Sequence, residues 1–198
     1  MDAKNTILDE KFRFAKELVT EAGDFLRQHL HDELQIEAKT DFTDLVTHLD
    51  RQVQAEMTQS ILAHYPDDVI YGEESLNLQP LNQGAVWVID PIDGTNNFVA
   101  QKTDFAVILA YLEDGQGQFG LIYDVMNDQL YHGGGSFPVC LNQEVLPKYE
   151  DKPFHQGLIG MSAGLFHQDQ PNFRNFALQS LGTRSYGSAG LSFCHVLT

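Results

Sequence analysis

The segment from Trp87 to Phe98 reads WVIDPIDGTNNF and contains two carboxylates, Asp90 and Asp93, close together in the chain. The apolar run Val86–Ile89 predicts a buried strand that ends at Asp90, so both carboxylates lie at its carboxyl end. The peptide carbonyl of Ile92 lies between them and offers a further oxygen. Because hard divalent cations bind carboxylate and carbonyl oxygens, the segment predicts a cation site where this strand ends.

The two residues after Asp93 are suited to an anion. Gly94 has no Cβ, so a ligand can come close to its backbone. Thr95 is predicted to be the N-cap of a following helix, whose first N–H groups point toward an anion. A divalent cation beside such N–H donors is able to hold a phosphate group.

A second acidic segment, Gly72–Ser75, reads GEES and follows a predicted strand, Val69–Tyr71. Taken alone, an acidic pair on a loop is more typical of a solvated surface than of a site. A cation site becomes the favoured interpretation once Asp90 is considered too, because the carboxylate of Glu73 would complete the oxygen ligands of the cation.

A third segment, Lys39–Asp50, reads KTDFTDLVTHLD and leads into a predicted helix from Leu49 to His64. Thr47 and Asp50 have the spacing of a capping box, with aspartate in the position of glutamate. A charged loop followed by a capped helix explains this segment equally well, with Asp50 favoured by the helix dipole.

These three segments, in this order, resemble the inositol monophosphatase family. That family carries a lysine followed by DLVTxxD, then GEES, then WxIDPIDGTxNF. A weaker match consists of Arg184 and the segment Gly187–Leu191, which reads GSAGL where the family has GSAAL. The resemblance extends from the first predicted helix to Thr198. It implies an α+β layered sandwich of the inositol monophosphatase/fructose-1,6-bisphosphatase type.

The resemblance also implies a role for individual residues. The metal ligands, for two or three Mg²⁺ ions, would be Glu73, Asp90, Asp93 and the carbonyl of Ile92. The backbone amides of Gly94 and Thr95 would hold the phosphate.

Further roles follow from the same resemblance. Asp50 and Thr95 would orient and deprotonate a water activated by the metal, with Glu73 contributing to catalysis. Lys39 and Asp44 would support the metal ligands without touching the ion. Ser188 and Ala189 would flank the alcohol part of the substrate.

The expected function is therefore Mg²⁺-dependent hydrolysis of a small phosphate monoester, with inositol monophosphate as the leading substrate. Charge neutralisation and positioning must supply most of the acceleration, because such esters hydrolyse very slowly in water. Alternative substrates are fructose 1,6-bisphosphate, 3′-phosphoadenosine 5′-phosphate and NADP. A different alternative is a non-catalytic family member that acts as a protein-binding partner.

The predicted elements form one domain over residues 1–198. Its regions are N-terminal helices at about 7–65, a sheet with the metal site at about 69–162, and the start of a C-terminal region at about 171–198. Further helices are predicted at Ile7–Leu30, Pro171–Leu181 and Ser188–Leu197. Further strands are predicted at Phe105–Leu112, Phe119–Val125, Gln129–His132 and Gly157–Ser162, with turns at Asp114–Gly115 and Asn127–Asp128.

Composition limits the partners. The net charge of −16 disfavours binding to nucleic acid or to anionic membranes. Two widely spaced cysteines form no disulfide framework, and no secretory signal or long apolar run is visible, so a cytoplasmic protein is expected. The resemblance adds a possible homodimer.

The family pattern continues with a W-D-x-A-A-G segment that this chain does not reach. The chain is therefore expected to lack the C-terminal portion of the domain. The aspartate of the missing segment is a further metal ligand in the family. We accordingly expect these 198 residues alone to be weakly active or inactive and only marginally folded.

Overall fold

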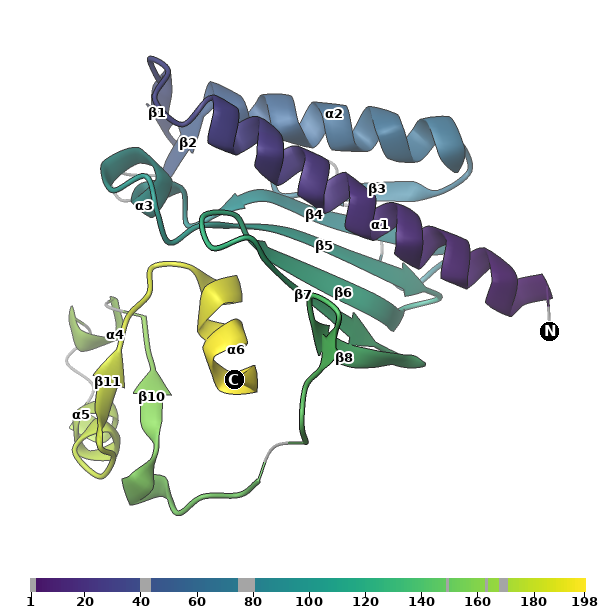
Figure 1. Cartoon of the computed structure of the whole chain (residues 1–198). Coiled ribbons are helices and arrows are strands. Elements are labelled where there is room, and N and C mark those ends of the chain that lie inside the picture. The colour runs from purple at the N-terminus through teal and green to yellow at the C-terminus, as the bar shows by residue number, and fades with distance from the viewer. Residues whose placement is uncertain (1–2, 40–43, 75–80, 149, 163, 168–170) are drawn as a thin grey trace.

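The computed structural model describes residues 3–39, 44–74, 81–148, 150–162, 164–167 and 171–198 (Figure 1). Ser75 of the GEES segment and residues 40–43 of the Lys39–Asp50 segment lie outside this part. The helices are α1 (Ala3–Gln28), α2 (His48–His64), α3 (Thr95–Ala100), α4 (Gly164–His167), α5 (Pro171–Ala177) and α6 (Ala189–Leu197), with a 3₁₀ turn at Phe154–Gln156. The strands are β1 (Ile36–Ala38), β2 (Leu45–Thr47), β3 (Val69–Gly72), β4 (Ala85–Asp93), β5 (Ala106–Glu113), β6 (Gln116–Asp124), β7 (Gln129–Gly134), β8 (Phe137–Leu141), β9 (Glu144–Val145), β10 (Leu158–Gly160) and β11 (Gly182–Arg184).

A seven-stranded sheet in the order β3-β4-β5-β6-β7-β8-β9 forms the centre of the fold. Strands β3 and β4 pair in parallel, and each later pair of neighbours is antiparallel. Helices α1 and α2 lie across one face of this sheet, and α6 lies on the other side (Figure 1). The predicted α+β layered fold is confirmed. Among the described residues, no helix has the length and apolarity needed to cross a bilayer.

The core lies between the two long helices and the sheet. The apolar residues of each helix recur every three or four positions, so they form one stripe that faces the strands. Fully buried side chains from both layers meet there, namely Ala15, Val19, Leu26, Val53, Ile61, Trp87, Leu109 and Tyr111.

The predicted antiparallel meander is confirmed in strands β5, β6 and β7. Both turns have left-handed backbone at the expected places, with φ of 49° at Asp114, 75° at Gly115 and 53° at Asp128. Aspartate and glycine are among the residues that adopt this conformation most readily, which is why these turns could be predicted from the sequence.

The C-terminal region differs in detail from the prediction. Helix α5 ends at Ala177 rather than Leu181, because the Ser180 hydroxyl donates to the Ala177 carbonyl (2.8 Å) and the chain turns there. Strand β10 is shorter than predicted and pairs in parallel with β11 in a separate small sheet. The predicted helix after Ser188 is confirmed as α6.

The prediction that the central strand ends at Asp90 is wrong, because β4 continues to Asp93. Pairing with β5 shifts between these residues, with Asp90 opposite Ile108 and Asp93 opposite Ala106. Pro91 has no N–H to give to the ladder, which favours an irregularity at this point. The extra residue changes the normal alternation of side chains, and both carboxylates therefore reach the same pocket.

Candidate active site

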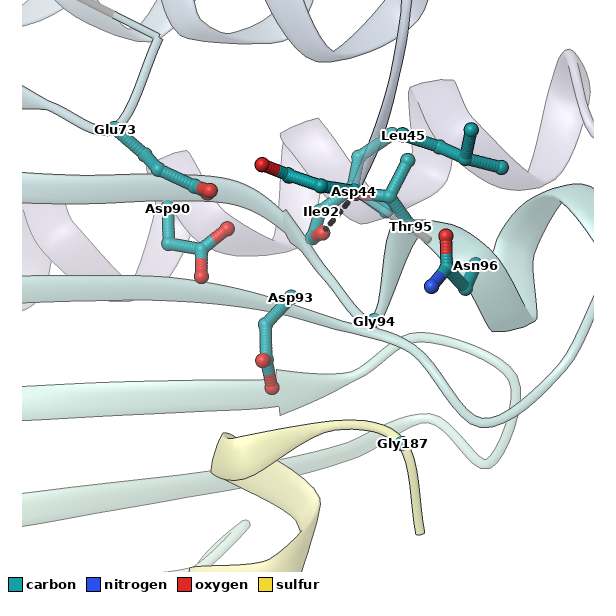
Figure 2. A pocket seen from close by; sticks show the side chains of 10 residues that line it. All are labelled: Asp44, Leu45, Glu73, Asp90, Ile92, Asp93, Gly94, Thr95, Asn96 and Gly187. Atoms are coloured by element: carbon teal, nitrogen blue, oxygen red, sulfur yellow. Dashed lines mark hydrogen bonds between the residues drawn. The ribbon is translucent and has the colours of Figure 1, made fainter. Parts of the chain in front are cut away.

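One cavity of about 170 Å³ opens where β4 passes into α3. Its lining combines the turn after β3, strand β4, the start of α3, the start of β2 and the loop before α6 (Figure 2). The lining residues are Asp44, Leu45, Glu73, Asp90, Ile92, Asp93, Gly94, Thr95, Asn96 and Gly187. Sequence segments far apart in the chain therefore meet at this cavity, as the motifs predict.

Parallel pairing brings Glu73 and Asp90 together. The Glu73 N–H donates to the Ile89 carbonyl (3.0 Å), so the turn after β3 lies beside the end of β4. Gln54 of α2 fixes the same turn by accepting a hydrogen bond from the Glu74 N–H (2.8 Å). The carboxylates of Glu73 and Asp90 point toward one space (Figure 2).

Asp90 is the most perturbed acid of the pocket. Within the described part of the chain, its Oδ1 atom is buried without a hydrogen-bond partner. Burial raises the pKa of Asp90 well above the usual carboxyl range, and the negative charges of Glu73 and Asp93 raise it further. A buried carboxylate in this situation fits a cation that would replace its missing partners.

The side chain of Asp93 turns toward α6 (Figure 2). Its Oδ1 accepts the Ala189 N–H (3.0 Å), and its Oδ2 accepts the Gly190 N–H (2.7 Å) and the Ser188 hydroxyl. Ser188 and Ala189, which the resemblance places beside the substrate, therefore contact Asp93 in this structure.

The predicted capping box at the start of α2 is confirmed, and it holds Asp50. The Oδ2 atom of Asp50 accepts the N–H (2.8 Å) and the hydroxyl (2.6 Å) of Thr47. The side chain is only 1% exposed, and this burial raises its pKa despite the hydrogen bonds from Thr47 and Thr95.

Asp50 also reaches the pocket through Thr95. The Thr95 hydroxyl lies 3.1 Å from Asp50 Oδ1 and 2.9 Å from the Ile92 carbonyl, and it can donate to either. The prediction that Thr95 is an N-cap is wrong, because Gly94 holds that position and Thr95 begins α3. The turn needs a glycine, since φ is 95° and a Cβ would lie 3.0 Å from the Asp104 carbonyl.

Lys39 supports the acidic side of the pocket. Its Nζ lies 2.9 Å from Glu73 Oε1 and 2.6 Å from Glu74 Oε1. Burial disfavours the charge of Lys39, but the contacts with Glu74 and Glu73 outweigh it and raise the pKa of the ammonium group. Asp44 lines the pocket, and its carbonyl accepts the Lys39 N–H (2.7 Å) across the β1–β2 hairpin.

Sequence reasoning missed Asn97, which joins the parts of the site. Its side-chain amide donates to the carbonyls of Asp104 and Tyr186, both at 2.7 Å. Gly187 packs so closely that a Cβ there would lie 2.8 Å from Asn97 Oδ1. Asn97 falls inside the WVIDPIDGTNNF segment, but nothing in that segment reveals the two distant loops that it binds.

The donor set suits a hard cation, although it is not yet arranged around one. Among the described residues, no three acidic, histidine or cysteine side chains converge on a single point. The pocket nevertheless offers carboxylate oxygens of Glu73 and Asp90, including the buried Oδ1 of Asp90, and a backbone carbonyl at Ile92. This is all-oxygen chemistry of the kind that Mg²⁺ prefers.

Comparison with known proteins finds relatives over nearly the whole chain. The model of the inositol monophosphatase family matches residues 7–198. Inositol-1-monophosphatase of Bacillus subtilis (strain 168) is 36% identical over 197 residues, covering 96% of this chain and 73% of that protein.

Two solved structures are similar over nearly the whole chain. Inositol monophosphate-bound SaIMPase-II has 30% identity and a TM-score of 0.82, covering 94% of this chain and 69% of that one. An IMPase/NADP phosphatase complexed with Mg²⁺ and phosphate has 25% identity and a TM-score of 0.87, covering 96% and 72%.

Fold and relatives together define the class of protein as a phosphoric monoester hydrolase. The chain belongs to the inositol monophosphatase family. The predicted family, fold type and enzyme class are confirmed.

Proposed function

We propose that this chain carries the Mg²⁺-dependent site of a phosphatase that hydrolyses a small phosphate monoester, with inositol monophosphate as the leading substrate. The observation that carries the proposal is the buried Oδ1 of Asp90, which has no hydrogen-bond partner among the described residues and lies between the charges of Glu73 and Asp93. The names of the Bacillus relative and of the inositol monophosphate complex support the choice of substrate.

The residues that would hold Mg²⁺ are Glu73, Asp90, Asp93 and the carbonyl of Ile92. When bound, Mg²⁺ neutralises the charge of a phosphate and lowers the pKa of water, which makes a nucleophile available at neutral pH. The cation is needed for binding as well, because a chain of net charge −16 otherwise repels an anionic substrate.

Thr95 and Asp50 would take up the proton of the attacking water. The Thr95 hydroxyl can accept a hydrogen bond from the attacking water while it donates to Asp50 Oδ1. The raised pKa of Asp50 makes its carboxylate a stronger base than an exposed aspartate, and the hydrogen bonds from Thr47 to Oδ2 fix its position.

The phosphate would lie against the start of α3. First-turn N–H groups of a helix have no partner within the helix, and those of Gly94 and Thr95 lie at the pocket. Lys39 provides a positive charge beside Glu73.

The remaining features of the protein stay predictions. Fructose 1,6-bisphosphate, 3′-phosphoadenosine 5′-phosphate and NADP are alternative substrates, and a non-catalytic binding role is the alternative from another class. A cytoplasmic location and a possible homodimer are also part of the proposal, as is the absence of nucleic-acid and membrane partners.

The test is release of inorganic phosphate from a panel of these esters, with and without Mg²⁺. We expect hydrolysis that requires Mg²⁺, is fastest with inositol monophosphate, and is lost in Asp90→Asn. The matched control is Asp32→Asn, which removes an equal charge at an exposed turn. The proposal is wrong if Asp90→Asn and Asp32→Asn hydrolyse the esters equally well, or if no ester is hydrolysed even by a form of the chain that is extended to include the family's C-terminal segment.

A further inference from the structure

The amino terminus of α6 binds the carboxylate of Asp93 from a position 95 residues further along the chain. Both side chains are almost fully buried, with 9% of Asp93 and 4% of Ser188 exposed. The approach is close at Gly190, where a Cβ would lie 2.9 Å from Asp93 Oδ2. A larger residue at position 190 would push the helix away from the carboxylate.

The hydrogen bonds leave Asp93 able to bind a cation. An ionised carboxylate has about four lone-pair sites. Oδ2 accepts two hydrogen bonds, from the Gly190 N–H and the Ser188 hydroxyl, whereas Oδ1 accepts one, from the Ala189 N–H. The remaining lone pair is therefore on Oδ1, and the orientation of the side chain is set by the helix.

Ser188 has two partners at once. Its hydroxyl proton goes to Asp93 Oδ2, and its oxygen accepts the Leu191 N–H (3.0 Å) as the N-cap of α6. The start of the helix and the rotamer of Asp93 are consequently fixed by the same hydroxyl group. A substrate hydroxyl could accept the Ser188 proton only after the bond to Asp93 had broken.

We propose that Ser188 is a positioning residue, whose hydroxyl holds the Asp93 carboxylate in place for cation binding rather than donating a hydrogen bond to the substrate. This rests on the proposed function, since it presumes that Asp93 is a ligand. Partners that orient a metal ligand contribute strongly to affinity, and their removal typically weakens metal binding about tenfold or more. Loss of the hydroxyl leaves two amide donors on Asp93, so the main effect is a less restricted side chain.

The experiment measures Mg²⁺ affinity directly, by titration calorimetry on the unliganded protein at a temperature where every variant is folded. We expect Ser188→Ala to raise the Kd for Mg²⁺ about tenfold, and Ser188→Thr, which keeps the hydroxyl, to restore it. Ser192→Ala is the matched control, because its hydroxyl donates to the Ser188 carbonyl (2.7 Å) within the same helix and is not bonded to Asp93. Its Kd should equal that of the wild type.

A further variant, Ser188→Gly, distinguishes the effect of losing the N-cap of α6 from the effect of losing the hydrogen bond to Asp93. Glycine is tolerated at an N-cap but has no hydroxyl, so the thermal stability of this variant should change little while its Kd for Mg²⁺ rises. The inference is overturned if Ser188→Ala binds Mg²⁺ as the wild type does, or if Ser192→Ala is weakened equally. Failure of the wild type to bind Mg²⁺ at all would instead overturn the proposed function, and this inference with it.

Discussion

The carboxylate of Asp90 is held in an environment that disfavours its charge. Burial and the neighbouring charges of Glu73 and Asp93 raise its pKa. Because the folded state holds this proton more tightly than the unfolded chain does, the metal-free protein loses stability as pH rises from the ordinary carboxyl pKa toward the raised one. The same site that is proposed to bind the cation therefore destabilises the protein when no cation is bound.

Replacing Asp90 should reverse this effect. We expect Asp90→Asn to be more stable than the wild type at about pH 8 without Mg²⁺, because the unfavourable charge is removed. The wild type should gain stability on acidification to about pH 6, by less than about 1.4 kcal/mol per pH unit, and the variant should gain less. Urea unfolding at both pH values measures the difference, and equal pH dependence in both proteins would contradict it.

A second residue-scale prediction concerns the Thr95 hydroxyl. Thr95→Val keeps the shape of the side chain but removes the group that joins the pocket to Asp50. We expect kcat to fall by about 100-fold or more, as for loss of a general acid–base group. Thr95→Ser should keep most of the activity. Similar kcat values for the valine and serine variants would exclude the proton route through Thr95.

At the scale of elements, the sequence predicted those parts that depend on local rules. Helix α2 was recognised from Thr47 and Asp50, and the meander from turn residues such as Asp114. The contact between Asp93 and α6 was not predicted, because it joins residues 95 positions apart and no local pattern records such a pairing. The end of β4 was misplaced for a related reason, since its bulge depends on pairing with β5.

Helix α1 is joined to the sheet by a buried ion pair between Lys11 and Asp68. Lys11, only 5% exposed, has its Nζ 2.5 Å from Asp68 Oδ2 and 2.8 Å from the Tyr111 hydroxyl. Asp68 also accepts the indole N–H of Trp87 (2.8 Å). The ammonium group lies 4.4 Å from the centre of the Tyr111 ring, which adds a cation–π contact. One lysine thus joins α1, the loop before β3, and the central strands.

Breaking this ion pair from one side should be costly. Lys11→Met keeps the length of the side chain but leaves Asp68 as an unpaired, largely buried charge, so we expect a loss of about 3–5 kcal/mol in the free energy of unfolding. Adding Asp68→Asn should recover part of that loss. Urea unfolding of both single variants and the double variant measures the coupling, and strictly additive effects would show that the pair contributes nothing specific.

At the scale of the whole molecule, the net charge of −16 means that acidic side chains repel one another throughout the chain and not only in the pocket. Such repulsion opposes the compact state, and mobile ions screen it over about 10 Å at 0.1 M ionic strength. Monovalent salt should therefore stabilise the protein without occupying the site, whereas Mg²⁺ should act both by screening and by binding.

These two effects can be separated by thermal unfolding. We expect the melting temperature to rise with KCl up to about 0.3 M in both the wild type and Asp90→Asn. At that KCl concentration, millimolar Mg²⁺ should raise it further only in the wild type, through linkage of binding to folding. A further rise of the same size in Asp90→Asn would mean that the ion binds elsewhere.

The bond between Asp93 and Ser188 also has a consequence for the order of events during synthesis. Chains emerge from the ribosome N-terminus first, and bringing distant residues together carries a loop-closure cost. Helices α1 and α2 and the strands up to β9 all precede Ser188 in the chain. The carboxylate of Asp93 gains its partners on α6 only when residues 188–190 arrive, so the pocket of a nascent chain stays unfinished until that point of synthesis.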